Sequence, residues 1–282
     1  MGIKFTKMQG CGNDFVIVDY EEFKKSGLQM DEAARKLCDR HFGVGADGLI
    51  IPDTNCDEAD IGWFFYNSDG STAQMCGNGM RCFAKYVYDK KLVDKKEFTV
   101  KTLAGIIKPQ ILDNGQVRVN MSKPILDTNE IPFLPNDNLN YKISVQDRIF
   151  VGNAVSMGNP HFVIFIKDNE NLLELAKTYG PEIELGAEFP EKTNVEFIKI
   201  HSPKEIELCV WERGCGITLA CGTGACASVV AGILNGLLEN NVDVELLGGK
   251  VNVVWNGTPN KPQGDVFLSG PAEYMFNAEI NI

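Results

Sequence analysis

A motif that occurs twice in this chain constrains its fold more than any other feature. Cys-Gly-Asn-Gly begins at Cys76, and Cys-Gly-Thr-Gly begins 145 residues later at Cys221. An aromatic residue stands ten positions before each cysteine, Tyr66 in one case and Trp211 in the other, and a polar residue follows it. Self-similarity at a fixed spacing indicates that one structural unit has been duplicated.

A further match lies upstream of both cysteines, at offsets of 146 and 147 residues. The matching segments are Gly12-Asn13 with Phe15-Val-Ile, and Gly158-Asn159 with Phe162-Val-Ile. Three separate matches at nearly one offset predict two copies of a unit of about 120–145 residues.

The duplication predicts two pseudo-symmetric domains. The first comprises residues 1–122 and a C-terminal strand at about 268–282, and it carries Cys76. The second comprises residues 123–267 and carries Cys221. The turn-forming residues of Lys123–Asn140 make this stretch the best candidate for a linker.

Hydrophobic periodicity predicts the same elements in both halves. Apolar residues alternate in short strands at the start of each half and before each cysteine. These strands are Ile3–Met8, Phe15–Asp19, Ile61–Tyr66, Phe150–Ser156, Phe162–Ile166 and Ile206–Trp211. A helix follows each cysteine, at Gly79–Val87 and Gly224–Leu238, and the second is apolar on nearly every side, so it must be buried. We therefore predict an α/β (α+β) fold in which each domain is a barrel-like, mostly antiparallel sheet wrapped around a central helix.

The position of each cysteine just before a helix has chemical consequences. The first turn of a helix has unpaired N–H groups and partial positive charge, which lower the pKa of a thiol and attract a carboxylate. If the two units face each other, one thiolate can remove an α-proton while the opposite thiol protonates the other face of the carbon. The alternative is that the cysteines are inert core residues at tight turns. Their duplication at one place in the repeat favours catalysis.

At these residues the sequence resembles the diaminopimelate epimerase family, over nearly the whole chain. Eight motifs carry the resemblance: Met8-Gln-Gly-Cys-Gly-Asn-Asp-Phe, Arg40-His-Phe-Gly-Val-Gly-Ala-Asp-Gly, Asn67-Ser-Asp-Gly-Ser, Met75-Cys-Gly-Asn-Gly-Met-Arg-Cys, Met157-Gly-Asn-Pro-His-Phe, Thr193-Asn-Val-Glu-Phe, Trp211-Glu-Arg-Gly and Ala220-Cys-Gly-Thr-Gly-Ala-Cys. The resemblance implies an isomerase that interconverts LL- and meso-diaminopimelate on the route to lysine and peptidoglycan. It also implies two similar α/β domains, a homodimer, and no pyridoxal phosphate or metal.

The resemblance assigns roles to residues by position. Cys76 and Cys221 correspond to the catalytic pair. The backbone at Gly77, Asn78, Gly222 and Thr223 corresponds to the site of the carboxylate at the reacting carbon. The distal end of the substrate corresponds to Asn13, Asn67, Asn159, Asn194, Glu212 and Arg213. His161 and Glu212 are candidates for tuning the protonation of the thiols.

One position departs from part of the family. Some members have Gln where this chain has Gly48, and that Gln touches substrate, so no side-chain contact is expected here. Gly43–Gly48 also matches the dinucleotide fingerprint G-x-G-x-x-G. A nucleotide site is not expected, because a predicted helix precedes the glycines and a predicted strand follows them, the reverse of the required order.

Composition limits the partners and the compartment. The net charge of −11 argues against binding to nucleic acid, and no apolar run reaches the 18 residues of a membrane span. Nine cysteines, an odd number, in a chain with no apparent export signal favour a cytoplasmic protein with free thiols. Seven of them are expected to be core residues or bystanders: Cys11, Cys38, Cys56, Cys82, Cys209, Cys215 and Cys226.

Two other functions stay open at this point. A cofactor-independent racemase or epimerase of another amino acid would use the same pair of thiols. A non-catalytic protein that binds metal or thiols through its cysteines is the third possibility.

Overall fold

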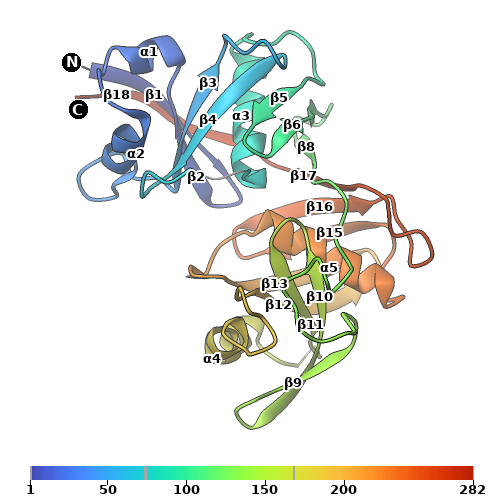
Figure 1. Cartoon of the computed structure of the whole chain (residues 1–282). Coiled ribbons are helices and arrows are strands. Elements are labelled where there is room, and N and C mark those ends of the chain that lie inside the picture. The colour runs from blue at the N-terminus through green and yellow to red at the C-terminus, as the bar shows by residue number, and fades with distance from the viewer. Residues whose placement is uncertain (1, 73–74, 168, 282) are drawn as a thin grey trace. The chain divides into compact units, whose positions relative to one another are not determined.

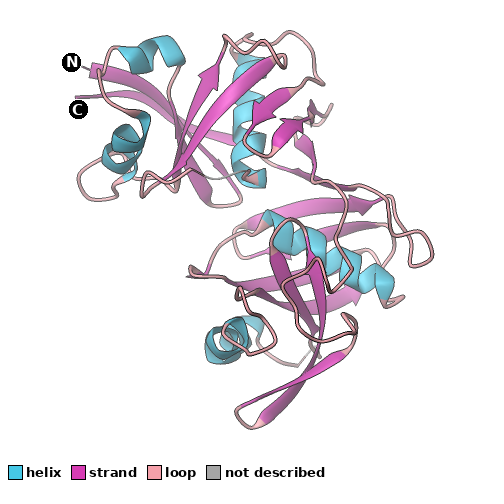
Figure 2. Ribbon diagram, viewed as in Figure 1, coloured by secondary structure: helices cyan, strands magenta, loops and turns pink. Residues whose placement is uncertain are grey.

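The computed structural model describes residues 2–72, 75–167 and 169–281. The chain divides into two compact units, Met1–Asn120 with Ser269–Ile282, and Met121–Leu268. Residues 1 and 282, the outer ends of the first predicted domain, lie outside the described residues. Both units combine helices with mostly antiparallel strands, which confirms the predicted α/β class (Figure 2).

The first unit is built on a seven-stranded sheet with the order β18-β1-β2-β3-β4-β5-β6. Its elements are β1 (Gly2–Gly10), β2 (Asn13–Ile17), α1 (Tyr20–Lys24), α2 (Met30–Cys38), β3 (Gly48–Asp53), β4 (Ile61–Asn67), α3 (Gly77–Asp89), β5 (Val100–Thr102), β6 (Gly105–Ile107), β7 (Pro109–Ile111), β8 (Val117–Asn120) and β18 (Glu273–Asn281). β7 and β8 form an antiparallel pair.

The sheet of the second unit has the order β17-β16-β15-β13-β12-β11-β10-β9, with β14 paired to β13. Its elements are β9 (Tyr141–Val145), β10 (Arg148–Ser156), β11 (Pro160–Phe165), α4 (Leu172–Glu184), β12 (Asn194–Ser202), β13 (Glu205–Glu212), β14 (Gly216–Ile217), α5 (Gly222–Leu234), β15 (Asn241–Leu246), β16 (Gly249–Trp255) and β17 (Val266–Gly270). β17 begins in this unit and ends in the first.

The strand pairings of the two units repeat one pattern. β1 and β2 are antiparallel, β2 and β3 parallel, β3 and β4 antiparallel, and β4 and β5 parallel. β10, β11, β12, β13 and β15 repeat these four relations in the same order. The internal repeat of the sequence therefore corresponds to a repeat of topology.

Each sheet has helices on both faces, and its alternating side chains are buried on both (Figure 1). In the first unit, Val16 and Leu49 pack with α2, whereas Phe15 points towards α3. In the second unit, the strands pack on α4 on one side and on α5 on the other. Residues 224–233 of α5 are all buried, as its apolar sequence predicts.

The predicted end of the second central helix was wrong. Prediction extended it to Leu238, but α5 ends at Leu234 because Gly236 adopts a left-handed conformation with φ of 69°. The N–H of Gly236 donates to the carbonyl of Ile233, and that of Leu237 donates to Gly232, a common way to terminate a helix. Leu238 then folds back over Gly232, where a larger residue would collide with it.

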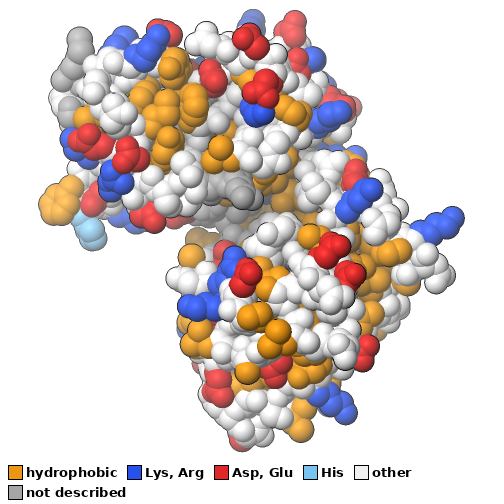
Figure 3. All heavy atoms as spheres, viewed as in Figure 1, with side chains coloured by type: hydrophobic (Ala, Val, Ile, Leu, Met, Phe, Trp, Pro, Cys, Tyr) orange, Lys and Arg blue, Asp and Glu red, His pale blue; other side chains and the backbone are white. Residues whose placement is uncertain are grey.

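The glycines 43–48 lie between α2 and β3, so helix precedes strand as expected. Within the described residues, no helix is long and apolar enough to cross a membrane. Figure 3 shows acidic and basic side chains interspersed on the visible face of each unit rather than separated by sign.

Candidate active site

Cys76 and Cys221 occupy the same structural position, one in each unit. Each is the residue immediately before its central helix, with extended backbone angles of −136° and 113° for Cys76 and −118° and 108° for Cys221. The Sγ atom of Cys76 accepts a hydrogen bond from the N–H of Gly79 at 3.3 Å. The Sγ atom of Cys221 accepts one from Gly224, also at 3.3 Å. Both sulfurs therefore cap a helix N-terminus, where negative charge is stabilised.

The other predicted residues lie beside these caps, because strand direction brings them to one edge of each sheet. β2 and β3 start, and β4 ends, at the same edge, since Gly48 pairs with both Phe15 and Asn67. In the second unit, β11 and β12 start and β13 ends at the equivalent edge. The residues gathered there are Asn13, Gly48 and Asn67 in the first unit, and Asn159, His161, Asn194, Glu212 and Arg213 in the second.

In the first unit, Asn13 directly contacts the cap. Its Oδ1 atom accepts a hydrogen bond from Asn78 Nδ2 at 3.2 Å and faces the thiol of Cys76, with 3.7 Å between Oδ1 and Sγ. Its Nδ2 atom donates to Asp47 Oδ2 at 2.5 Å. The structure thus brings Asn13, Asn78 and Cys76 together, although Asn13 was assigned to the distal end of the substrate, and it adds Asp47.

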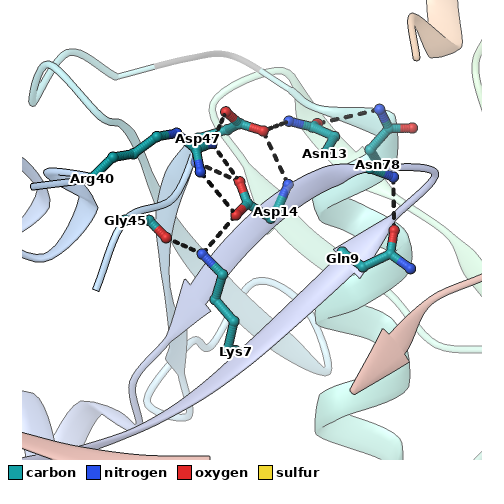
Figure 4. Close-up of polar contacts among 9 residues, drawn as sticks. Lys7, Gln9, Asn13, Asp14, Arg40, Gly45, Asp47 and Asn78 are labelled. Carbon is teal, nitrogen blue, oxygen red and sulfur yellow. Dashed lines mark hydrogen bonds and ion pairs between the residues drawn. The ribbon is translucent and has the colours of Figure 1, made fainter. Parts of the chain in front are cut away.

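Charged side chains surround Asp47 (Figure 4). Arg40 bridges Asp47 and Asp14, at 2.8 and 2.9 Å, and Lys7 pairs with Asp14 at 2.7 Å. Burial opposes ionisation of Asp14, but hydrogen bonds from Arg40 and Lys7 outweigh it and lower the pKa of this carboxyl. Asp14 therefore stays ionised, and its contacts tie the start of β2 to Arg40 and Lys7.

Asn67 and Gly48 lie at the same edge of the sheet. Asn67 forms a tight turn, because its side chain donates to Ser71 Oγ at 3.0 Å and its N–H donates to the carbonyl of Ser71. A Cβ atom at Gly48 would lie 2.8 Å from the ring of Phe65 and 2.9 Å from the carbonyl of Tyr66. A glutamine at this position would therefore require Phe65 to move.

In the second unit, Cys221 lies against Glu212 and Thr223. Thr223 Oγ1 is 3.5 Å from Sγ, and a hydrogen bond joins the thiol to the carboxylate of Glu212. Burial, then the charges of Glu212 and Glu196, raise the pKa of Cys221 well above its ordinary value. The sequence predicted a lowered pKa for this thiol, because the helix terminus favours the thiolate. At Cys221 that effect is outweighed by burial and by two carboxylates.

Burial also raises the pKa of Glu212, although hydrogen bonds from Thr218 and Cys221 oppose the effect. Thr218 Oγ1 donates to Glu212 Oε1. The carboxyl group of Glu212 thus lies next to the thiol whose protonation the resemblance expects it to tune.

His161 forms a fully buried pair with Glu196. Their Nδ1 and Oε1 atoms are 2.6 Å apart and hydrogen-bonded, and both side chains are 0% exposed. The opposite ring nitrogen of His161 donates to Asn159 Oδ1 at 3.1 Å, while Asn159 Nδ2 donates to Thr223 at 3.3 Å. Glu196 Oε2 is buried without a hydrogen-bond partner among the described residues. His161 is therefore connected to the Cys221 cap through Asn159 and Thr223.

Asn194 and Arg213 shape the approach to this half of the site. Asn194 donates to the carbonyl of Pro160 at 2.8 Å and accepts from the N–H of Arg213 at 3.0 Å, so its amide joins two strand ends. A cavity of about 340 Å³ lies beside them, and its lining includes Asn159 and Arg213 together with Ile131 and Pro132. The Nη1 atom of Arg213 donates to the carbonyl of Glu191 at 3.0 Å, and Glu191 also lines this cavity.

Four charged residues at the site were missed from the sequence: Asp14, Asp47, Arg81 and Glu196. All four lie inside the motifs that carry the family resemblance. Glu196 and Arg81 did carry a signal, since each stands directly between two apolar residues of a strand or helix, and each is 0% exposed. A charge at such a position must have a partner. Among the described residues, no group of three or more His, Cys, Asp or Glu side chains is arranged to hold a metal ion.

Comparison with known proteins identifies the family. The sequence profile described as diaminopimelate epimerase matches residues 5–126 and 153–275. The chain belongs to the diaminopimelate epimerase family. Membership makes it an enzyme of the isomerase class.

Individual members of the diaminopimelate epimerase family match along their full length. The protein of Halothermothrix orenii is 47% identical over 100% of this chain and 99% of its own. That of Carboxydothermus hydrogenoformans is 48% identical over 98% of this chain and 99% of its own. Both are named diaminopimelate epimerase.

Solved structures share the fold at low sequence identity. A hydroxyproline epimerase from Agrobacterium vitis has a TM-score of 0.69 and 11% identity, with 99% of this chain and 92% of that one covered. A PhzF-family phenazine biosynthesis protein from Bacillus anthracis has a TM-score of 0.68 and 16% identity, with both chains fully covered. The duplicated fold predicted from the sequence is thus one used by racemases and epimerases of other substrates.

Proposed function

We propose that this enzyme interconverts LL- and meso-diaminopimelate by transferring protons between the substrate and two thiols, Cys76 and Cys221. The observation that carries the proposal is the matched pair of caps, in which each sulfur accepts the N–H of the third helical residue at 3.3 Å. A single cysteine at a helix terminus can be explained by its structural role alone. Two such cysteines with the same geometry at repeat-related positions, in an isomerase family, favour an acid and a base that act as a pair.

Each unit contributes one thiol to the reaction. The thiolate of one cysteine removes the α-proton, and the thiol of the other delivers a proton to the opposite face of the carbon. The first N–H groups of each central helix have no partner within the helix. Those at Gly77, Asn78, Gly222 and Thr223 would therefore bind the carboxylate next to the reacting carbon and stabilise the charge that develops on it.

The protonation of Cys221 follows from its surroundings. Burial and two nearby carboxylates raise the pKa of its thiol, so in the substrate-free enzyme this cysteine carries its proton. Cys221 would then act as the acid in the first turnover, and Glu212, hydrogen-bonded to the thiol, would restore its proton afterwards.

The distal end of the substrate is assigned to the polar residues at the sheet edges. Arg213 would pair with the distal carboxylate through two parallel hydrogen bonds. Glu212 was also assigned to the distal ammonium, but its hydrogen bond to the Cys221 thiol favours the tuning role instead. Asn13, Asn67, Asn159 and Asn194 would complete the set as amide donors and acceptors. The cavity of about 340 Å³ beside Asn159 and Arg213 supports this assignment for the second unit.

Incubation of the reduced enzyme with LL-diaminopimelate in deuterated buffer tests the proposal. Because the donated proton comes from a thiol in exchange with solvent, meso product should carry deuterium at one α-carbon. Arg213→Ala should weaken the binding of diaminopimelate strongly, since one carboxylate loses its partner. Absence of label under reducing conditions would rule out the proposed reaction.

A second candidate is an epimerase or racemase of another amino acid with the same thiols. The structural similarity to a hydroxyproline epimerase favours it. Deuterium incorporation into a panel of amino acids separates the two candidates. Turnover of a substrate with one amino-acid end, unaffected by Arg213→Ala, would favour the second.

The proposal includes a cytoplasmic homodimer. All nine cysteines lie in the described part of the chain and are free thiols, which supports a reducing compartment. β18 exposes Tyr274, Met275 and Phe276 at the edge of the first sheet, which supports pairing with a second copy there.

A further inference from the structure

The side-chain amides of Asn13 and Asn78 lie beside Cys76. The group at one end of this pair can only donate hydrogen bonds, and the group at the other end can only accept them. Arg81 is fully buried, and its guanidinium only donates hydrogen bonds. Its Nη1 atom donates to Asn78 Oδ1 at 2.9 Å. Asn78 must therefore turn its Nδ2 atom away from Arg81 and towards Asn13, where it donates to Oδ1 at 3.2 Å.

The carboxylate of Asp47 acts from the other end, because it only accepts hydrogen bonds. Its Oδ2 atom accepts from Asn13 Nδ2 at 2.5 Å and from the N–H of Asp14 at 3.0 Å. Its Oδ1 atom accepts from Arg40 at 2.8 Å. The direction of every hydrogen bond from Arg81 through Asn78 and Asn13 to Asp47 is thereby determined.

The second unit has neither an arginine at the position of Arg81 nor an aspartate at that of Asp47. The repeat offset of 145 that relates the two cysteines places Cys226 at the position of Arg81. The strand register places Asn194 at the position of Asp47, since Phe15 pairs with Gly48 and Phe162 with Val195. The amide of Asn159 is reversed relative to that of Asn13, because its Nδ2 atom faces the cap and its Oδ1 atom faces His161.

We propose that Arg81 and Asp47 are positioning residues that together hold the Asn13 carbonyl towards Cys76, where it accepts a hydrogen bond whenever this thiol is protonated. The 3.7 Å contact between Cys76 Sγ and Asn13 Oδ1 is the result. The N–H of Gly79 favours the thiolate of Cys76, and the Asn13 carbonyl opposes it. These two groups therefore act on the pKa of Cys76 in opposite directions, and the distant charges of Arg81 and Asp47 keep the Asn13 carbonyl in place. The catalytic meaning of this balance rests on the proposed role of Cys76.

The charges that surround this chain of bonds come from every neighbouring element. They are Lys7 on β1, Asp14 on β2, Arg40 after α2, Asp47 before β3 and Arg81 on α3. Asp14 is the informative neighbour, because it shares Arg40 with Asp47 but its side chain contacts neither amide. Removing its charge therefore tests electrostatics without changing the orientation of Asn13.

Asp47→Ala is the principal test. It removes both acceptor oxygens of Asp47, and with them the anchor that holds the Nδ2 atom of Asn13 away from Cys76. Peptide-resolved alkylation of Cys76 across pH 5–10, without substrate, should show an apparent pKa lower by about one unit, a tenfold change in acid dissociation. Asp14→Ala should produce a much smaller shift. Asp47→Glu, which only accepts, should restore the wild-type profile. An unchanged profile in Asp47→Ala, or equal shifts in Asp47→Ala and Asp14→Ala, would overturn the proposal.

A second measurement uses only the wild-type protein. Neutron diffraction from deuterium-exchanged crystals should locate two deuterons on the Asn13 atom that faces Asp47. Deuterons on the atom that faces Cys76 would overturn the proposal independently of any variant. Both tests examine the thiol without substrate, so the inference can fail while deuterium incorporation into diaminopimelate succeeds, and the reverse also holds.

Discussion

The two units hold their cysteines in the same backbone setting but in different polar surroundings. Both cysteines cap a helix through an N–H 3.3 Å away, and both follow a strand that ends at the equivalent edge of its sheet. Around Cys76, the neighbouring amides lie between the buried Arg81 and the partly exposed ion pair of Asp47 with Arg40. Around Cys221, a buried histidine and two carboxylates take the corresponding places. Duplication thus supplies two equivalent helix caps, whereas the charged side chains around them differ.

The largest expected effect concerns the two capping cysteines, which are the feature that both units share. Replacement of either cysteine, in Cys76→Ala or Cys221→Ala, should reduce deuterium exchange at the α-carbon by about 10²–10⁴-fold, because each removes one acid–base group. Exchange is measured by mass spectrometry of the product.

The control for these variants is Cys56→Ser, which changes a half-buried thiol in the loop between β3 and β4. Its activity should equal that of the wild type. Near-normal exchange in either of the two alanine variants would contradict the equivalence of the two caps.

The next effect concerns the free energy of unfolding, which should respond differently in the two units. Glu196→Ala should destabilise the second unit by about 3 kcal/mol, since it leaves His161 buried without its partner. Asp47→Ala should cost the first unit only about 1 kcal/mol, because its side chain is 42% exposed. Urea-dependent hydrogen exchange, resolved to peptides of β12 and β3, measures both values. Equal losses in the two units would show that the distinction between buried and surface control is wrong.

A smaller effect tests the cause of the raised pKa of Cys221. Glu212→Gln removes a negative charge beside the thiol and so favours the thiolate. The pKa measured by alkylation of Cys221 should fall by about one unit. Glu207→Gln is the matched control, as it removes the same charge from an exposed position on the same strand. The assignment fails if both variants shift Cys221 equally.

The smallest effect compares the ends of the two central helices. Gly236 after α5 and Lys91 after α3 are equivalent, with φ of 69° and 57°, and both donate to the carbonyl three residues earlier. Lys91→Gly should stabilise the protein by about 0.5–1 kcal/mol, because glycine adopts this conformation without strain, and Gly236→Ala should destabilise it by about 1 kcal/mol. Thermal unfolding measures both, and opposite signs are the decisive result.

The sequence predicted the parts of this molecule that depend on local pattern. The duplicated Cys-Gly-x-Gly motif located both caps and both central helices, and alternation of apolar residues located the strands that precede them. The end of α5 was misjudged although Gly236 was visible, because an apolar run continues to Leu238. Nothing in the sequence marked Lys91 as left-handed.

The polar surroundings of the thiols could not be predicted in the same way. Asp47 and Asn13 are 34 residues apart, and Glu196 and His161 are 35 apart. Their contacts depend on strand order and register rather than on neighbouring residues. The direction of the pKa shift of Cys221 was wrong for this reason, since the helix terminus is a local feature whereas burial by β12 and β13 is not.

The pairing of β18 with β1 has a consequence for biosynthesis. Gly2–Gly10 is made before the second unit, but its outer partner, β18, is made after it, and Asn281 lies opposite Gly2. The second unit, Met121–Leu268, is continuous and can fold as soon as it leaves the ribosome. The first unit is thus completed only after the second has been translated, and until then the β1 edge must be kept from pairing with other nascent chains. Deletion of a few residues from the end of β18 should therefore destabilise the first unit. The second unit, although it is closer in sequence to the deletion, should stay folded.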